Sequence, residues 1–332
     1  MKILVVRFSS IGDIVLTTPV VRCLKNQLPT SEIHYLTKKS FLPVIKGNPN
    51  IDKIHTIDRS IKEVTPILKN ENFDFIVDLH NNIRTKSLTF QLKKPFARFP
   101  KLHLLKWLYV QFKIDQLPAL HIVDRYFKAV EKLGITNDQN TCDFFILKED
   151  KIDPMAHFGV REKTYIAFAI GAQFATKRLP THKIIEICEG IDAPIILLGG
   201  KEDIDISAKI KQKLPNKIIN ACGLLRIGQS ASVVQNAKAV LTHDTGLMHI
   251  SSAFQVPIIS IWGNTTPSLG MSPYNPQQTT KVSIHQVEKL SCRPCSKIGF
   301  QSCPKKHFHC MELQNVNEII AQTNSFIGQN PS

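Results

Sequence analysis

The chain has 332 residues, of which 43% are hydrophobic and 21% are charged, so it supports two ordinary globular domains and excludes wholesale disorder. Its formal net charge of +15 favours anionic partners, namely nucleic acid, phosphorylated ligands or an anionic membrane surface. The sequence contains no apolar run of about 18 residues, so it indicates no transmembrane helix. The apolar run at the start is too short for an export signal. We therefore expect a protein of the reducing cytoplasm.

Short apolar runs alternate with amphipathic stretches, which predicts βαβ units and parallel sheets. In the first half we expect strands at 2–7, 32–37, 53–57 and 73–79. A Ser-Ser-Ile-Gly-Asp turn follows the first strand and leads into one helix whose apolar positions run from Ile14 to Leu24. A further helix is expected at 121–135, with Gly134 as its stop.

The stretch 84–113 is basic and aromatic, with eight Lys and Arg residues and no acidic residue. Such a segment suits a membrane interface or an acidic glycolipid. It equally suits a solvated basic face over an ordinary amphipathic helix. The residues alone leave both interpretations open.

A polar stretch near 150–162 predicts the linker between an N-terminal domain, 1–155, and a C-terminal domain, 156–332. The last helix of the C-terminal domain is expected to pack back on the N-terminal domain. In the second half we expect strands at 165–170, 193–200, 217–223, 239–246 and 256–263, with helices after Pro180 and at 203–214, 230–238 and 247–254. Two similar α/β halves predict a ligand cleft between domains.

The turn after the first strand is the first candidate site, because ligands of open α/β sheets bind at the carboxyl ends of strands. Gly12 permits a sharp turn there. Asp13 would either cap the next helix, the commoner role of such a residue, or act as a general base on an acceptor hydroxyl. The GxGxxG fingerprint of dinucleotide-binding dehydrogenases is absent.

Two further candidate sites lie in the second half. Asp244-Thr245-Gly246-Leu247-Met248-His249 joins a strand to a helix, whose first amides would point at a pyrophosphate; the alternative is a simple turn with a core histidine. Lys177, in the loop after the strand that ends before Gly171, would neutralise a phosphate, although a loop lysine is more often just solvated.

Together these motifs resemble glycosyltransferase family 9, the ADP-heptose:lipopolysaccharide heptosyltransferases. The resemblance runs in order through VRFSSIGDIVLTTPV, HIVDRYFKAVEKLGI, KRLP, LLGGKED and THDTGLMHISSAF followed by VPIISIWG. Several ordered segments are far more specific than any one motif. The loop before Lys177 departs from the family pattern, which weakens the match at Thr176, and Leu179 stands where the family often has an aromatic residue.

The resemblance implies a GT-B fold, two Rossmann-like domains facing across a cleft, and an inverting transfer that needs no metal cofactor. It implies that Asp13 is the general base and that Lys177 holds the donor diphosphate or sugar. The other residues that it places at the donor are Gly171, Thr176, Glu202, Asp244, Thr245, Gly246, Leu247 and His249. Those expected at the acceptor are Arg7, Ser10, Gly12, Asn82 and Arg84.

The expected partners are therefore ADP-heptose or a similar nucleotide sugar and an anionic lipid A–core acceptor at the inner face of the plasma membrane, with no nucleic acid. An alternative is another GT-B transferase that uses a different nucleotide sugar for a different surface glycan. A nucleic-acid-binding protein would also explain the charge, but it leaves Asp13 and the Asp-Thr-Gly turn unexplained. A catalytically dead scaffold is disfavoured because both Asp13 and Lys177 are present.

Four of the eight cysteines are close in sequence, with Cys292-x2-Cys295-x7-Cys303-x6-Cys310 next to His307 and His309. The spacing is typical of a structural zinc site. Reduced thiols packed in a loop and disulfides formed in air are the alternatives. Any metal held here would be structural, because all its ligands lie in one short segment.

Overall fold

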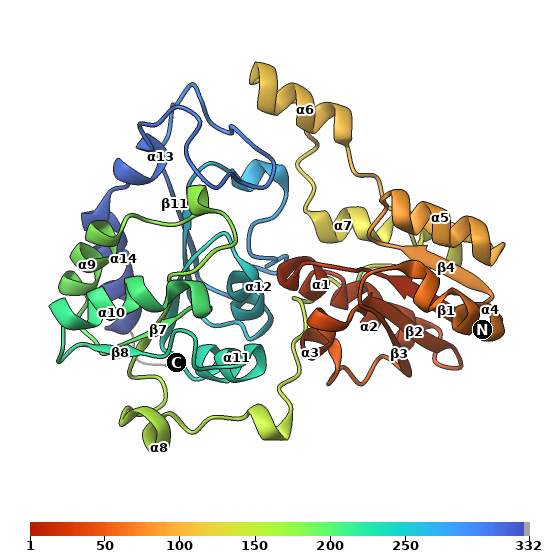
Figure 1. Ribbon diagram of the computed structural model, residues 1–332, viewed down its shortest axis with the longest axis horizontal. Coiled ribbons are helices and arrows are strands. Elements are labelled where there is room, and N and C mark those ends of the chain that lie inside the picture. The colour runs from red at the N-terminus through yellow and green to blue at the C-terminus, as the bar shows by residue number, and fades with distance from the viewer. Residues whose placement is uncertain (329–332) are drawn as a thin grey trace. The chain divides into compact units, whose positions relative to one another are not determined.

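A computed structural model describes residues 1–328 of the chain as two compact units, coloured along the chain in Figure 1. Unit 1 comprises Met1–Leu102, Leu120–Phe145 and Tyr274–Gln277. Unit 2 comprises His103–Ala119, Ile146–Pro273 and the chain from Gln278 onward. The chain therefore passes between the units several times, and the segment 103–119 packs with the second unit.

Unit 1 is built on a five-stranded sheet in the order β3-β2-β1-β4-β5, and its strand pairs are parallel. The strands are β1 (Lys2–Val6), β2 (Glu32–Lys38), β3 (Lys53–Ile57), β4 (Phe75–Asp78) and β5 (Phe96–Arg98). The helices are α1 (Ile11–Val15), α2 (Thr18–Gln27), α3 (Leu42–Ile45), α4 (Thr65–Asn70), α5 (Ile83–Leu92) and α7 (Ile122–Phe127). Strand β1 is central and buried on both faces, which its continuous apolar run predicts.

Unit 2 has a six-stranded sheet in the order β11-β10-β9-β6-β7-β8, again paired in parallel. The strands are β6 (Ile166–Ala169), β7 (Ile195–Leu198), β8 (Ile218–Asn220), β9 (Ala239–His243), β10 (Ile258–Trp262) and β11 (Val282–Gln286). The helices are α6 (His103–Phe112), α8 (Pro154–Phe158), α9 (Thr181–Gly190), α10 (Ile204–Lys213), α11 (Ile227–Gln235), α12 (Gly246–Ala253), α13 (His309–Glu312) and α14 (Val316–Ile327). Helix α14 packs against α9 and strands β9 and β10 of this unit.

The structure differs from the predicted elements mainly in the first half. The single helix expected after β1 is two, because Pro19 occupies the first turn of α2 and proline lacks the amide that a continuing helix needs. The helix expected at 121–135 ends at Phe127 and is followed by a short 3-10 turn that Gly134 closes at φ 72°. Strands β5 and β11 were not predicted. Among residues 1–328, no helix combines the length and apolar character that crossing a bilayer requires.

An ion-pair network ties α2 to a segment more than a hundred residues later in the chain. Arg22 binds Asp138 through Nε at 2.8 Å and Asp143 through a terminal nitrogen at 2.5 Å. Burial alone would raise the pKa of Asp138, but its hydrogen bonds to Arg22 and to the Asn140 amide outweigh burial and lower the pKa to about 2. The network therefore fastens the segment 120–145, which re-enters unit 1, to helix α2.

We expect Arg22→Met to destabilise unit 1 by about 2 kcal/mol or more in urea unfolding at pH 7, because two largely buried carboxylates lose their only shared cation. The effect should shrink as the pH falls from about 4 through about 2, because Asp138 is then protonated and no longer gains from the pair. Arg59→Met, which removes an exposed arginine of the same unit, is the control and should be neutral. Equal stability of the two variants would contradict a stabilising network.

Candidate active site

Arg7, the first residue after β1, organises the carboxyl edge of the unit 1 sheet. Its guanidinium is buried and donates to the carbonyl oxygens of Ser9 and Leu79 at 2.7 and 2.6 Å. It also donates to the Tyr126 hydroxyl at 3.1 Å and forms an ion pair with Asp13 at 2.6 Å. Burial alone would lower the pKa of Arg7, but the Asp13 carboxylate outweighs burial and raises the pKa.

Asp13 has both the capping contacts and the exposure that its two predicted roles require. It is the third residue of α1, and its Oδ2 accepts hydrogen bonds from the Ser10 amide at 3.2 Å and the Ser10 hydroxyl at 2.8 Å. Its other oxygen pairs with Arg7, yet 24% of the side chain remains exposed. Gly12, directly before it, is buried in the same short helix. The geometry therefore allows a cap that still presents a carboxylate to a ligand.

Histidine, arginine and lysine side chains lie near one another at this edge of the sheet. The ring of His80, after β4, lies 5.1 Å from the Phe8 ring in a tilted arrangement, and the guanidinium of Arg84 lies 5.4 Å above the same Phe8 ring. Burial, then the charges of Arg7 and Lys101, lower the pKa of His80 to about 3, so this imidazole is neutral at physiological pH. Within the described residues, its buried Nδ1 has no hydrogen-bond partner.

The structure brings Arg7, Asp13 and Arg84, which were predicted site residues, close to His80. His80 itself was not predicted as a site residue. Asn82 is the N-cap of α5 and accepts the Thr85 amide at 2.9 Å, so its side-chain oxygen already serves the fold. A polar cluster directly after a buried strand was the signal for His80 in the sequence.

In unit 2, Lys177 and Asp244 come together from loops after two neighbouring strands. The Lys177 ammonium lies 2.5 Å from Asp244 Oδ2 and 3.3 Å from the Asp244 carbonyl oxygen. Thr265, after β10, donates its hydroxyl to the same carboxylate oxygen at 2.9 Å. Both charged side chains are largely buried, at 16% and 10% exposure. Parallel pairing of β6, β9 and β10 sets these loops side by side.

Helix α12 begins beside this pair. Thr245 is its N-cap in extended conformation, and the Thr245 side chain makes no capping hydrogen bond to the first turn, which starts with Gly246 and Leu247. A helix of eight residues with open amides at its start favours a negative charge there. His249 is buried on the same helix, away from solvent, which fits a supporting role.

Thr176, expected near the donor, lies almost fully buried and is engaged within the fold. Its hydroxyl donates to Asn264 Oδ1 at 3.0 Å and accepts the Phe300 amide at 2.8 Å. It thereby links the loops after β6 and β10 to the segment around Phe300. Asn264 and Thr265 were missed, although a polar run directly after an apolar strand was the signal that pointed to them.

Gly171, two residues after the end of β6, lies against Asp203. A Cβ placed on Gly171 would come 2.1 Å from Asp203 Oδ2, so any side chain there would require the Asp203 carboxylate to shift. Asp203 is buried, accepts the Gly200 amide at 2.8 Å and pairs with Arg178 at 3.4 Å. Glu202, its exposed neighbour, is the residue that was predicted; Arg178 and Asp203 were not.

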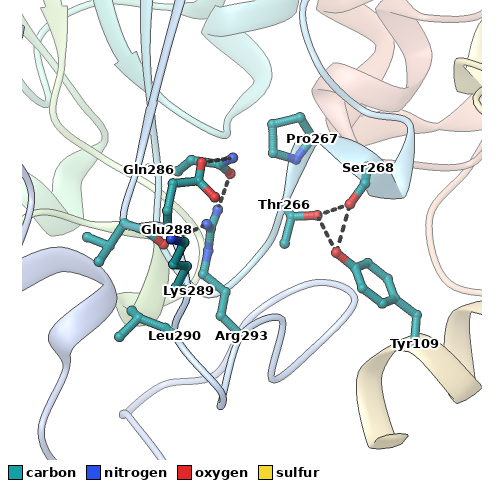
Figure 2. A pocket seen from close by; sticks show the side chains of 10 residues that line it. Tyr109, Thr266, Pro267, Ser268, Gln286, Glu288, Lys289, Leu290 and Arg293 are labelled. Carbon is teal, nitrogen blue, oxygen red and sulfur yellow. Dashed lines mark hydrogen bonds between the residues drawn. The ribbon is translucent and has the colours of Figure 1, made fainter. Parts of the chain in front are cut away.

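A cavity of about 270 Å³ lies elsewhere in unit 2, with Tyr109 on one side and Arg293 on the other (Figure 2). Arg293 donates to the Gly263 and Thr265 carbonyl oxygens and to the Gln286 side chain. Its cation therefore joins the loop after β10 to the end of β11. None of the predicted donor residues lines this cavity.

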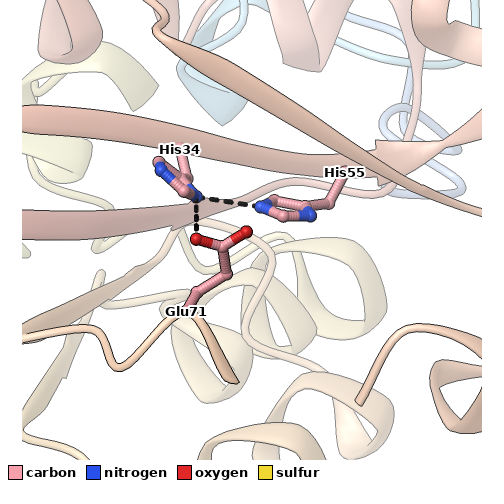
Figure 3. Close-up of side chains that lie close together, drawn as sticks. All are labelled: His34, His55 and Glu71. Atoms are coloured by element: carbon pink, nitrogen blue, oxygen red, sulfur yellow. Dashed lines mark hydrogen bonds and ion pairs between the residues drawn. The ribbon is translucent and has the colours of Figure 1, made fainter. Parts of the chain in front are cut away.

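A second cluster of polar groups lies at the opposite, amino edge of the unit 1 sheet. His34 Nδ1 lies 2.9 Å from His55 Nε2 and 4.0 Å from Glu71. Figure 3 shows the three side chains pointing toward one another. These are the only three ligand-type side chains within 4.8 Å of one another in the described part of the chain. Lys53 and Lys2 both bind Glu71 and, with Lys53 the larger influence, lower its pKa to about 2. Two ammonium groups at the carboxylate disfavour a metal cation, so we interpret the cluster as a hydrogen-bond network that joins strands.

The four clustered cysteines are free thiols, and Cys310 is buried. Cys292 Sγ lies 3.9 Å from His307 Nε2, and the proximity of Cys292 and Cys303 adds to burial in raising the pKa of Cys295. The donor types suit zinc, but no three of these ligand atoms come within 4.8 Å of one another among residues 1–328. Structural zinc therefore stays a prediction that requires the thiols to move closer together.

We expect Gly171→Ala to destabilise unit 2 by about 1–3 kcal/mol, because the new methyl group overlaps the buried Asp203 carboxylate. Thermal and urea unfolding measure the loss. Gly328→Ala, whose new methyl group meets only a carbonyl oxygen at 3.7 Å, is the matched control and should be close to neutral. A melting curve for Gly171→Ala that matches the wild type would show that the contact with Asp203 does not exclude larger residues at position 171.

Comparisons with known proteins agree with this architecture. The model of glycosyltransferase family 9 (heptosyltransferase) matches residues 62–299. Lipooligosaccharide heptosyltransferase 2 of Haemophilus influenzae is 23% identical, over 97% of this chain and 100% of the relative.

Two solved structures are similar over nearly the whole chain. A family 9 glycosyltransferase from Veillonella parvula has a TM-score of 0.79 at 22% identity and covers 98% of this chain and 97% of its own. The Escherichia coli heptosyltransferase WaaC with ADP has a TM-score of 0.71 at 17% identity, over 98% and 100% of the two chains. The predicted GT-B fold, with two Rossmann-like parallel-sheet domains, is confirmed. The chain therefore belongs to glycosyltransferase family 9, the heptosyltransferase family, and is a glycosyltransferase.

Proposed function

We propose that the protein transfers a heptose from ADP-heptose to the inner core of a lipopolysaccharide, with inversion at the anomeric carbon and Asp13 as the general base. The printed names of the relatives supply the substrate class, since they are heptosyltransferases of lipopolysaccharide or lipooligosaccharide. The observation that carries the proposal is the Lys177–Asp244 pair beside the uncapped start of α12.

This pair and helix suit the diphosphate of a nucleotide sugar. The ammonium of Lys177 is held in one place by Asp244, and Thr265 holds Asp244 in turn. The amides of Gly246 and Leu247 add partial positive charge without competition from a capping side chain. A leaving diphosphate gains negative charge during transfer, and positive groups that are already in place stabilise it without reorganisation.

The proposed reaction is one displacement. The acceptor hydroxyl oxygen forms a bond to the anomeric carbon, while the bond from that carbon to the diphosphate oxygen breaks and ADP leaves with the electron pair. The hydroxyl proton passes to a carboxylate oxygen of Asp13. Attack opposite the leaving group inverts the anomeric centre.

The contacts of Asp13 suit this role. The Arg7 guanidinium at 2.6 Å favours the ionised carboxylate that a base requires. Ser10 fixes the other oxygen, so the carboxylate is oriented before the acceptor arrives. Its 24% exposure leaves a side open to a ligand.

We assign acceptor binding to unit 1. His80 is neutral and offers a buried, unpartnered nitrogen, while Arg84 is exposed beside it. Cations there suit the phosphates and carboxylates of a lipid A–core acceptor. Because that acceptor is a lipid, we propose that the enzyme works in the cytoplasm at the inner face of the plasma membrane.

Asp13→Asn should lower kcat by about 100-fold or more, because an amide cannot accept the proton in the transition state. Affinity for ADP, measured by calorimetry, should stay at the wild-type value. Asp153→Asn changes another helix-capping aspartate, the exposed cap of α8, and should retain full activity. If Asp13→Asn turns over as fast as the parent, the proposed base is wrong.

Lys177→Met should weaken ADP binding about tenfold or more, because a charge-assisted contact to the diphosphate is lost. Lys183→Met in α9 is the control lysine and should bind normally. A Lys177→Met/Asp244→Asn double variant separates two explanations. If the double variant binds ADP like the wild type, Lys177 only neutralises Asp244 and does not contact the donor. A donor panel of ADP-heptose, UDP-sugars and GDP-sugars tests the sugar assignment in the same calorimeter.

A further inference from the structure

Helix α6 exposes an apolar surface that the core of unit 2 does not use. Its sequence is HLLKWLYVQF, and Val110 is its only buried residue. Leu104 is 66% exposed, Trp107 47% and Phe112 58%. The Trp107 and Phe112 rings meet edge to face at 5.3 Å, so they form one patch rather than scattered side chains. Leaving large apolar side chains in water is unfavourable, which favours a partner for this patch.

The opposite face of α6 is the one that attaches the helix to unit 2. Tyr109 points from α6 toward the loop after β10, where its hydroxyl lies 2.9 Å from the Ser268 hydroxyl (Figure 2). Lys113, just beyond the helix, donates to the Pro294 carbonyl oxygen at 2.6 Å. Residues 107 and 108 lie three and four positions after residue 104, so all three lie on the other side of the helix. The helix is thus held by one face and presents the other.

The charge around α6 selects the kind of partner. The helix carries Lys106 and is followed by Lys113, and no acidic residue occurs anywhere from position 84 to position 113. An exposed apolar face that includes a tryptophan, in a stretch of chain that carries lysines and no acidic residue, matches the surface of a bilayer that contains anionic lipids. Aromatic side chains with a polar atom suit the boundary between headgroups and acyl chains.

We propose that α6 lies in the plane of an anionic membrane surface, with Leu104, Trp107 and Phe112 inserted at the headgroup boundary. Ten residues cannot cross a bilayer, so the contact is peripheral. The proposal extends the proposed function by naming the segment that meets the lipid, but its test needs no transfer activity.

The chain supplies its own reporter for the test. It contains two tryptophans, and Trp262 is fully buried in the core of unit 2. A fluorescence change on mixing the full-length protein with vesicles therefore reports Trp107. We expect a blue shift with phosphatidylcholine vesicles that contain about 30% phosphatidylglycerol, and quenching by lipids brominated near the headgroup. The vesicles contain no lipopolysaccharide, so binding through the acceptor site does not contribute.

A Leu104→Ser/Phe112→Ser variant should bind these vesicles at least about tenfold more weakly in co-sedimentation, because inserted apolar area is lost. Both side chains are exposed, so the melting temperature and the transfer of heptose to a delipidated, water-soluble acceptor should not change. Ile298→Ser is the matched control, because Ile298 is a 60% exposed apolar residue elsewhere in unit 2 and should have no effect.

Each other outcome overturns the proposal. Unchanged Trp107 emission with anionic vesicles would show that the helix does not insert. Equal loss of binding in the Ile298→Ser control would show that any exposed apolar residue suffices. A variant that alters sedimentation of the protein alone, but not its vesicle binding, would assign the patch to a second copy of the chain. Failure of the proposed function would appear separately, as absent transfer to the soluble acceptor by the wild type.

Discussion

Parallel pairing of the strands is the constraint on which both candidate sites depend. Because the described strand pairs run in one direction, the loops that follow β1 and β4 in unit 1 meet at one edge of its sheet, and those after β6, β9 and β10 meet at one edge in unit 2. Residues far apart in the chain, such as Lys177 and Asp244, are neighbours for this reason. The amino edge of unit 1 holds a different network, His34, His55 and Glu71, whose lysine partners make it a structural feature.

In unit 1 the buried guanidinium of Arg7 sets the chemistry of its edge. It fixes two carbonyl oxygens and the Tyr126 hydroxyl, and its remaining nitrogen is committed to Asp13. A buried cation of this kind is costly unless each of its donors finds a partner, so the carboxylate at position 13 is part of the fold as well as a candidate base. Capping and catalysis are therefore compatible roles for Asp13. Capping uses its contacts within the fold, whereas catalysis would use the part of its side chain that is exposed.

The positive charge of the chain is used in several different ways. Arg22 joins helix α2 to Asp138, and Arg293 joins its own segment to the loop after β10, so both arginines stabilise the fold. Lys177 forms a largely buried ion pair with Asp244 beside the start of α12. Helix α6 exposes an apolar face within a stretch of chain that carries lysines and no acidic residue. The basic residues thus contribute to stability and, in our proposals, to donor binding and to the membrane contact.

The sequence by itself determined the α/β class, most strands of both sheets and the two turns that contain Asp13 and Asp244, because buried parallel strands read as continuous apolar runs that end in polar turns. It did not determine the break between α1 and α2, strand β5 or the length of α7, where proline and local packing override periodicity. Only the tertiary structure decided that Thr176 faces Asn264 inside the fold, that Asp203 fills the space beside Gly171, and that His80 stands among Arg7, Arg84 and Lys101. These relations join residues from separate loops, and the distance between loops is set by strand order, which no local pattern encodes.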